Sequence, residues 1–201
     1  MKLQAGACLV ACFVLWCAGS AAQTPKTKDG HWWQSVSADQ HTGFLAGYID
    51  CAVYDAGQKQ FAGASWDAME PQMSSYYASH PTSLDQSVAS VLPEFAGESP
   101  APKPGGGEKY PERHGIFDGE YWRQSTPDHR LGYLIGYLEC QSKRPNPRPG
   151  FSRDASWYEK QISDWYGVRD DDPGAINAAR AGRKIADVLY QFRTRPSAAK
   201  K

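Results

Sequence analysis

Two nine-residue stretches decide the fold: GFLAGYIDC at residues 43–51 and GYLIGYLEC at residues 132–140. In each stretch two glycines and a cysteine recur at every fourth position. Residues four apart share one face of an α-helix, so each stretch predicts a helix with a stripe of small side chains. Interior glycine costs about 1 kcal/mol relative to alanine. A compensating contact is therefore expected at all four glycines, Gly43, Gly47, Gly132 and Gly136.

Close packing of the two helices is the interpretation that we favour for this stripe, because such spacing recurs where helix backbones meet. A groove for a ligand along the bare face is the alternative. Cys51 and Cys140 end the two stripes. A parallel crossing would bring these cysteines within reach of a disulfide, whereas an antiparallel crossing would leave two buried thiols.

The similarity between the two stretches extends further along the chain. Residues 29–51 and 118–140 align without a gap at an offset of 89 and are identical at nine of 23 positions. We therefore interpret the chain as a tandem duplication, with helical repeats at residues 23–96 and 114–193. The Pro- and Gly-rich residues 97–113 are expected to form a linker, and residues 194–201 a disordered tail.

Helix starts are indicated by capping residues at Ser37, Thr126 and Ser156 and, for the last helix of each repeat, at Ser83 and Asp172. Apolar residues follow these caps at helical spacing. No stretch shows convincing strict alternation of polar and apolar residues. The predicted class is therefore all-α, a duplicated helical repeat packed as a pseudo-two-fold domain.

Residues 1–22 are typical of a secretory signal peptide. Lys2 precedes an uncharged stretch from Ala5 to Ala18, and the small residues Ser20 and Ala22 precede the expected cleavage site after Ala22. The apolar stretch is shorter than the ~18 residues that a spanning helix needs, so the mature chain is not expected to insert stably in a membrane. Cleavage leaves two of five cysteines, a number that suits a disulfide in a periplasmic or secreted protein.

The composition excludes some functional classes. The 22 Lys and Arg balance the 22 Asp and Glu, so nothing suggests a nucleic-acid binder that works by bulk charge. The five histidines show no metal-ligand spacing, and no catalytic triad or phosphate loop is recognisable. We therefore expect no metal, no cofactor and no enzymatic activity. Acid–base catalysis by the equivalent residues Asp50 and Glu139 is the weakest alternative.

Aromatic residues are the remaining oddity, because several recur at equivalent positions of the two repeats. Rings of this kind dominate binding hot spots, but two small halves also need large side chains to fill a common core. Both interpretations stay open. The candidate binding surface comprises Trp33, Trp122, Tyr48, Tyr137, Asp50 and Glu139.

One further pattern points to a family. Residues 47–50 (GYID), residues 76–81 (YYASHP) and a short apolar helix through Val88 and Leu92 resemble the small helical periplasmic immunity proteins that neutralise toxins of type VI secretion. This chain departs from that pattern in being duplicated and in lacking its terminal cysteine. The resemblance implies a protein that binds and blocks another protein in the periplasm.

The first functional hypothesis is accordingly an exported protein-binding or inhibitory module. A periplasmic binder of small ligands or glycans, acting through the aromatic residues, is the second.

Overall fold

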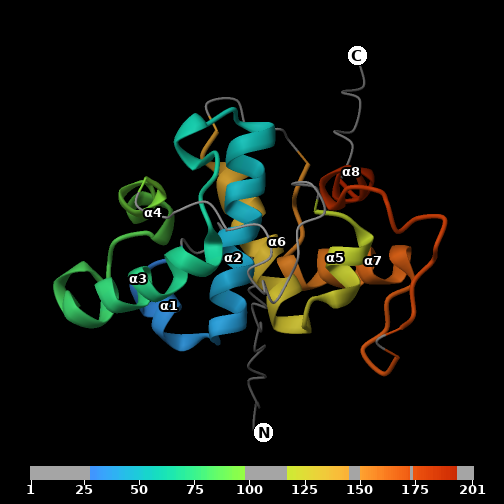
Figure 1. Ribbon diagram of the computed structural model, residues 1–201, viewed down its shortest axis with the longest axis horizontal. Helices are drawn as coiled ribbons and strands as arrows, with labels where there is room; N and C mark the ends of the chain where they lie inside the picture. The colour runs from blue at the N-terminus through green and yellow to red at the C-terminus, as the bar shows by residue number, and fades with distance from the viewer. Residues whose placement is uncertain (1–27, 98–116, 145–149, 173, 194–201) are drawn as a thin grey trace, which may run out of the picture.

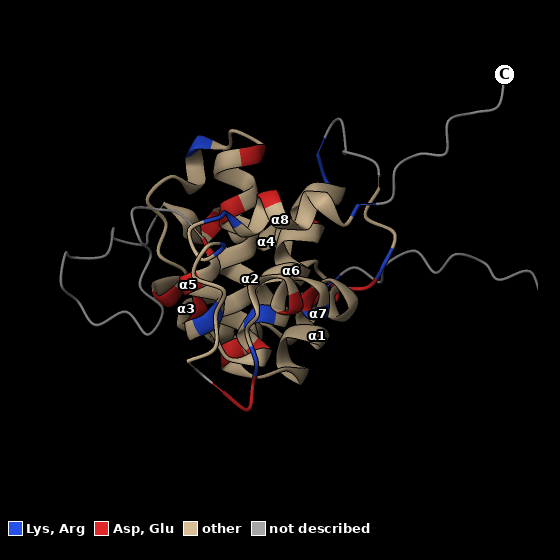
Figure 2. Ribbon diagram, turned by 90° about the vertical axis from the view of Figure 1, so that its right-hand side faces the viewer, with Lys and Arg blue, Asp and Glu red and all other residues tan. Residues whose placement is uncertain are grey.

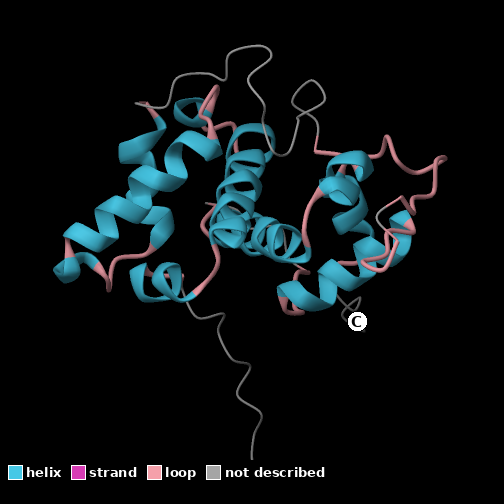
Figure 3. Ribbon diagram, turned by 60° about the horizontal axis from the view of Figure 1, so that its bottom comes forward, coloured by secondary structure: helices cyan, strands magenta, loops and turns pink. Residues whose placement is uncertain are grey.

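A computed structural model describes residues 28–97, 117–144, 150–172 and 174–193. The expected signal peptide, most of the expected linker and the expected tail lie outside these residues. The described part is helical and holds no β-strand, as Figure 3 shows, so the all-α class is confirmed. Its helices are α1 (Gly30–Ser35), α2 (Ala38–Asp50), α3 (Trp66–Ser79), α4 (Val88–Ala96), α5 (Gly119–Gln124), α6 (Pro127–Ser142), α7 (Ala155–Tyr166) and α8 (Ile185–Gln191).

Shorter helical turns connect these elements. A π-helical turn, η1 (Cys51–Asp55), continues α2, and two 3₁₀ turns, η2 (Lys59–Phe61) and η3 (Pro81–Ser83), flank α3. None of the helices in the described part is both long and apolar enough to cross a membrane.

The two central helices begin where the capping residues predict. The Ser37 side chain accepts a hydrogen bond from the Gln40 backbone N–H, and the Thr126 side chain accepts one from that of His129. Pro127 occupies the first turn of α6, where a missing N–H leaves no hydrogen bond unmade.

Two other predicted caps are wrong. Asp154 rather than Ser156 caps α7, because its carboxylate reaches the Trp157 N–H at 2.8 Å. Ser87 rather than Ser83 caps α4, since Ser83 already belongs to the 3₁₀ turn η3.

The predicted helix from Asp172 does not form, and α8 begins only at Ile185. Contacts with α7 hold the preceding segment in turns. The Asn177 N–H donates to the Tyr166 carbonyl at 2.6 Å, and the Arg180 guanidinium donates to the Trp165 carbonyl at 2.6 Å. Tertiary contacts here outweigh the helix preference of an alanine-rich sequence.

Helices α2 and α6 cross at the centre of the molecule, with α1, α3 and α4 on one side and α5, α7 and α8 on the other (Figure 1). The four stripe glycines lie at this crossing. A Cβ on Gly43 or Gly47 would meet the carbonyl oxygen of His129 or Tyr133 at 2.1 or 1.9 Å. Gly132 and Gly136 face the carbonyls of α2 in the same way. The bare stripes therefore serve close helix packing and leave no ligand groove between the two helices.

The crossing is fastened at both ends. At the N-terminal end, the Ser37 hydroxyl donates to Asp128 at 2.7 Å, and the Thr126 hydroxyl donates to Asp39 at 3.1 Å. Each helix cap thus binds the first turn of the other helix. At the C-terminal end, a disulfide joins Cys51 to Cys140 with a Cα–Cα distance of 6.1 Å. The caps of α2 and α6 meet at one end and their cysteines at the other, so the two helices run parallel. This is the direction that allows the disulfide, which the sequence left open.

Gly30 and Gly119, which are 89 positions apart, make similar contacts on the two sides of the crossing. The Gly30 N–H donates to the Leu84 carbonyl, and the Gly119 N–H donates to the Ala181 carbonyl. A Cβ on Gly30 would touch the Tyr77 ring, as one on Gly119 would touch the Tyr166 ring. Each short first helix is therefore held against the loop that follows the third helix of its own half.

Candidate functional site

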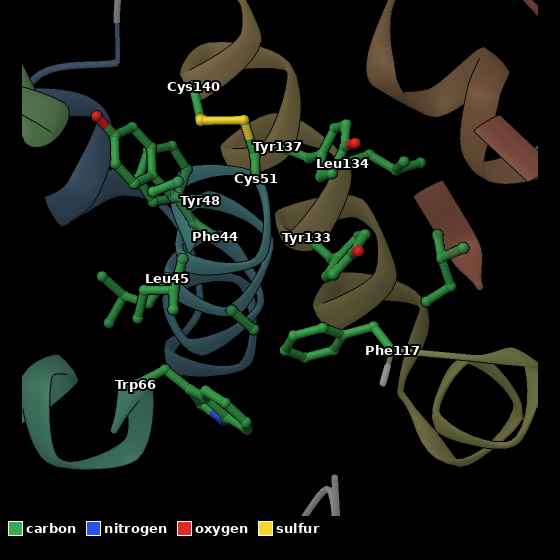
Figure 4. Close-up of a cluster of buried hydrophobic side chains, with 14 of the residues drawn as sticks. Phe44, Leu45, Tyr48, Cys51, Trp66, Phe117, Tyr133, Leu134, Tyr137 and Cys140 are labelled. Atoms are coloured by element: carbon green, nitrogen blue, oxygen red, sulfur yellow. A yellow bond between two sulfur atoms is a disulfide. The ribbon is translucent and has the colours of Figure 1, made fainter. Parts of the chain in front are cut away.

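The aromatic members of the expected binding surface are not on the surface. Trp33 and Trp122 are 1 % and 0 % exposed, and Tyr48 and Tyr137 are 5 % and 0 % exposed. These rings therefore lie in the core, which is one of the two interpretations that the sequence left open, because each half is too small to fill its interior without large rings. Figure 4 shows Tyr48 and Tyr137 among the core side chains beside the disulfide.

Asp50 lies in the same interior, at the end of α2, and is 8 % exposed. The Tyr133 hydroxyl on α6 donates to its Oδ2 atom at 2.5 Å, so this bond joins the two central helices. Burial raises the pKa of Asp50 from its ordinary 3.8 to about 7, although the Tyr133 hydrogen bond opposes the shift. Burial also raises the pKa of Tyr133 well above 10, with the Asp50 charge adding to the effect.

A second carboxylate stands close to the first. Asp55, at the end of η1, collects three donors on its Oδ2 atom: the hydroxyl of Tyr137, the hydroxyl of Tyr190 at 2.7 Å and the amide of Gln141 at 2.7 Å. A carboxylate oxygen accepts hydrogen bonds, so this one atom joins side chains from α6 and α8 to the end of η1. The Asp55 charge contributes to the raised pKa of Asp50, and Lys184 works against it.

Glu139 occupies the position on α6 that Asp50 occupies on α2, but its surroundings differ. Its carboxylate pairs with Lys143 at 3.3 Å, one turn along the same helix. Burial raises the pKa of Tyr48, and the Glu139 charge raises it further. A phenylalanine, Phe44, stands where α6 has Tyr133, so the bond that Asp50 receives has no counterpart at Glu139. The two acids therefore have separate partners and form no shared site.

The carboxylate–tyrosine cluster, defined here as Asp50, Asp55, Tyr133, Tyr137, Gln141 and Tyr190, places an acid with a raised pKa beside a second carboxyl group. Two carboxyl groups with such different environments are the arrangement that acid–base enzymes use. Here, however, Asp50 is buried and both carboxyl groups receive hydrogen bonds from core side chains. Within the described residues, no group of three or more His, Cys, Asp or Glu side chains is arranged to hold a metal ion.

Sequence reasoning missed Asp55, Gln141 and Tyr190, which belong to no motif. Tyr190 lies 135 positions beyond Asp55 along the chain, so only the folded structure reveals their contact. The sequence match at an offset of 89 does not reveal the cluster either, because no two of its residues are 89 positions apart.

Among the residues that the structure describes, few large apolar side chains are exposed. Tyr54 is 56 % exposed with the Lys184 ammonium 5.4 Å from its ring centre, and Trp157 is 36 % exposed with the Arg153 guanidinium at 5.8 Å. Acidic and basic positions are interspersed along the ribbon in Figure 2. The described surface is thus mixed in charge.

Comparison with known proteins adds no assignment: no family model, no curated protein and no solved structure matches this chain.

Proposed function

We propose that the mature chain is an exported protein-binding module of the inhibitory, immunity-like kind. One observation carries the proposal: the two halves are fastened at both ends of the α2–α6 crossing, by the paired caps and by the Cys51–Cys140 disulfide. Such fastening holds the outer faces of both halves in one fixed arrangement. A fixed surface favours recognition of a protein, because little conformational freedom is lost on binding.

The location of the chemically distinctive residues supports the same conclusion. The six residues of the carboxylate–tyrosine cluster receive or donate hydrogen bonds inside the fold. The proposal accordingly assigns no catalytic role to this cluster. A glycan binder was expected to use Trp33 and Trp122, which lie in the core, so we do not propose that alternative.

A tandem duplication is part of the proposal. It is supported by the sequence match at an offset of 89 and by equivalent contacts at the same offset. For example, the indole N–H of Trp33 donates to Ser74 at 3.0 Å, and that of Trp122 donates to Ser163 at 2.9 Å.

Export after cleavage near Ala22 is proposed from the sequence of the first 22 residues. A disulfide is compatible with an oxidising compartment such as the periplasm. N-terminal sequencing of the protein recovered from the periplasm should begin at Gln23. Recovery of a chain that still begins at Met1 would contradict the export proposal.

Affinity capture tests the binding function. The tagged mature chain is incubated with periplasmic and secreted fractions, captured proteins are identified by mass spectrometry, and each is purified and titrated against the chain. We expect one protein to bind in a defined ratio and to lose its own activity when bound. A tightly retained small molecule without any protein partner would refute the proposal.

A matched control uses the disulfide. Replacing Cys51 and Cys140 with alanine leaves the outer surface unchanged, because both residues are buried. If recognition depends on a fixed arrangement of the two halves, this variant should bind the partner more weakly than the parent chain while remaining helical. Equal affinity of a variant that is demonstrably loosened would remove the argument from rigidity.

A further inference from the structure

In the first half, a series of hydrogen bonds links α1, α3 and α2 and ends at His41. The indole N–H of Trp33 donates to Ser74 at 3.0 Å, and the Ser74 hydroxyl donates to the Glu70 carboxylate at 2.8 Å. The Nδ1 atom of His41 meets the same Glu70 oxygen at 3.0 Å. Its other nitrogen, Nε2, lies 2.5 Å from the backbone carbonyl oxygen of Trp33, and the His41 ring stacks on the Trp33 ring at 4.0 Å.

The second half contains a similar arrangement with Arg130 in place of His41, and Arg130 additionally pairs with Asp170. Trp122 donates to Ser163 at 2.9 Å, and Ser163 donates to the Glu159 carboxylate at 2.9 Å. Arg130, which is 89 positions beyond His41, donates to the same Glu159 oxygen at 2.9 Å. It also donates to the Ser125 carbonyl at 3.1 Å, and its guanidinium lies 6.0 Å from the centre of the Trp122 ring.

Both ring nitrogens of His41 face atoms that only accept hydrogen bonds. A backbone carbonyl and a carboxylate cannot donate, so each nitrogen needs its own proton to make a bond. Only the doubly protonated, positively charged ring satisfies Trp33 and Glu70 together. In a neutral ring one nitrogen carries no proton, so either the Trp33 carbonyl or the Glu70 carboxylate loses its hydrogen bond. Arg130 keeps all its hydrogen-bond donors, because its guanidinium stays charged at any physiological pH.

We propose that His41 gives the first half of the protein a response to pH that Arg130 does not give to the second half. Histidine is the side chain whose ordinary charge change falls between pH 5 and 8. On the acidic side the charged ring completes both bonds, and the packing of α1 and α3 against α2 is strongest. As the pH rises and the ring loses its proton, one bond is lost and α1 and α3 open more readily. Stability of the first half therefore falls with rising pH.

The groups around His41 support a stability of the first half that falls as the pH rises. From α3 the charged group that faces the ring is Glu70, and α1 contributes the uncharged ring and carbonyl of Trp33. On the opposite face of α2, α6 directs His129 to the Thr42 hydroxyl at 3.2 Å and Asp128 to Ser37. The His41 side chain is 9 % exposed and that of Glu70 is 18 % exposed, so solvent screens their interaction only in part.

Amide hydrogen exchange, followed by mass spectrometry of peptides, tests the proposal on the intact mature protein. Protection of α1 and α3 is compared with protection of α5 and α7 at pH 5.5 and pH 8, after correction for intrinsic exchange rates. We expect protection of α1 and α3 to fall by about ten-fold over this range, the effect of one unsatisfied buried acceptor, and to fall less in α5 and α7.

Two variants exchange the cations of the two halves. His41→Arg should remove the excess pH dependence from α1 and α3, and Arg130→His should create it in α5 and α7. Every other titratable group, including Asp50 and His129, remains in both proteins, so its contribution cancels in the comparison with the parent chain. Retention of the full pH dependence by His41→Arg would overturn the proposal.

A measurement on the parent chain decides the matter if the variants do not fold. Nitrogen-15 spectra of the His41 ring report whether one or both nitrogens carry a proton. Two protons are expected at pH 5.5, and the loss of one should follow the same pH course as the loss of protection in α1 and α3. Unchanged protection across the titration of the ring would overturn the proposal.

Discussion

Replacing Gly47 with alanine should disrupt the crossing of α2 and α6. The new Cβ would lie 1.9 Å from the carbonyl oxygen of Tyr133, whereas real Cβ atoms essentially never come closer than 3.0 Å to a neighbouring atom. The two helices would therefore have to separate by 1.1 Å, the difference between these distances. The obstacle is backbone, so it cannot turn away as a flexible side chain can.

The expected loss of stability follows from this displacement. Overpacking of a well-filled core typically costs about 1–3 kcal/mol and sometimes more. Alanine is favoured over glycine in a helix by about 1 kcal/mol, which offsets part of that cost. Because the displaced group is the backbone of the second central helix, we place the cost above the usual range and expect a net loss of about 2–3 kcal/mol.

Urea unfolding followed by far-ultraviolet circular dichroism measures the effect. Gly182→Ala is the matched control, because a Cβ at Gly182 would meet nothing within 4 Å. The control should change the free energy of unfolding by less than about 0.5 kcal/mol. If Gly47→Ala were as stable as Gly182→Ala, the close crossing of α2 and α6 described above would be refuted.

Three further substitutions test other features by urea unfolding. Replacing Cys51 and Cys140 with alanine opens a covalent loop of 89 residues and should destabilise the fold by up to about 4–5 kcal/mol, and reduction of the parent chain should give a similar loss. The raised pKa of Asp50 means that the folded state holds a proton that the unfolded state releases, so stability should fall by about 3 kcal/mol between pH 4 and pH 7, and Asp50→Asn should flatten this slope. Arg130→Met leaves the Glu159 carboxylate without its buried cation and should cost about 3–5 kcal/mol, whereas an effect below 1 kcal/mol would show that the ion pair is dispensable.

The central crossing was predictable because its signal is local. Glycines at every fourth position of a helix have little other use than close approach, and the cysteines follow at the same spacing. What the pattern left open was the direction of the crossing. The sequence does not state whether two matching helices run parallel or antiparallel, and the disulfide depends on that direction.

The remaining features depend on contacts distant in sequence. A tryptophan such as Trp33 has the same local signature in a core as on a surface, so its burial was not decided by the repeat. The segment before α8 has alanine-rich helical character, but bonds from Asn177 and Arg180 to α7 hold it in turns. The cluster around Asp55 unites three parts of the chain without any motif, so no local signal could reveal it.

The reciprocal bonds between helix caps give the molecule a mechanical property. Twisting one half against the other about the central helices would stretch Ser37–Asp128 and Thr126–Asp39 at one end and the disulfide at the other. The two hydrogen bonds and the disulfide lie at opposite ends of the α2–α6 crossing. Neither end of the crossing can therefore serve as a hinge. A load applied to one half is therefore passed to the other, and the described part of the protein is expected to withstand pulling forces as one body.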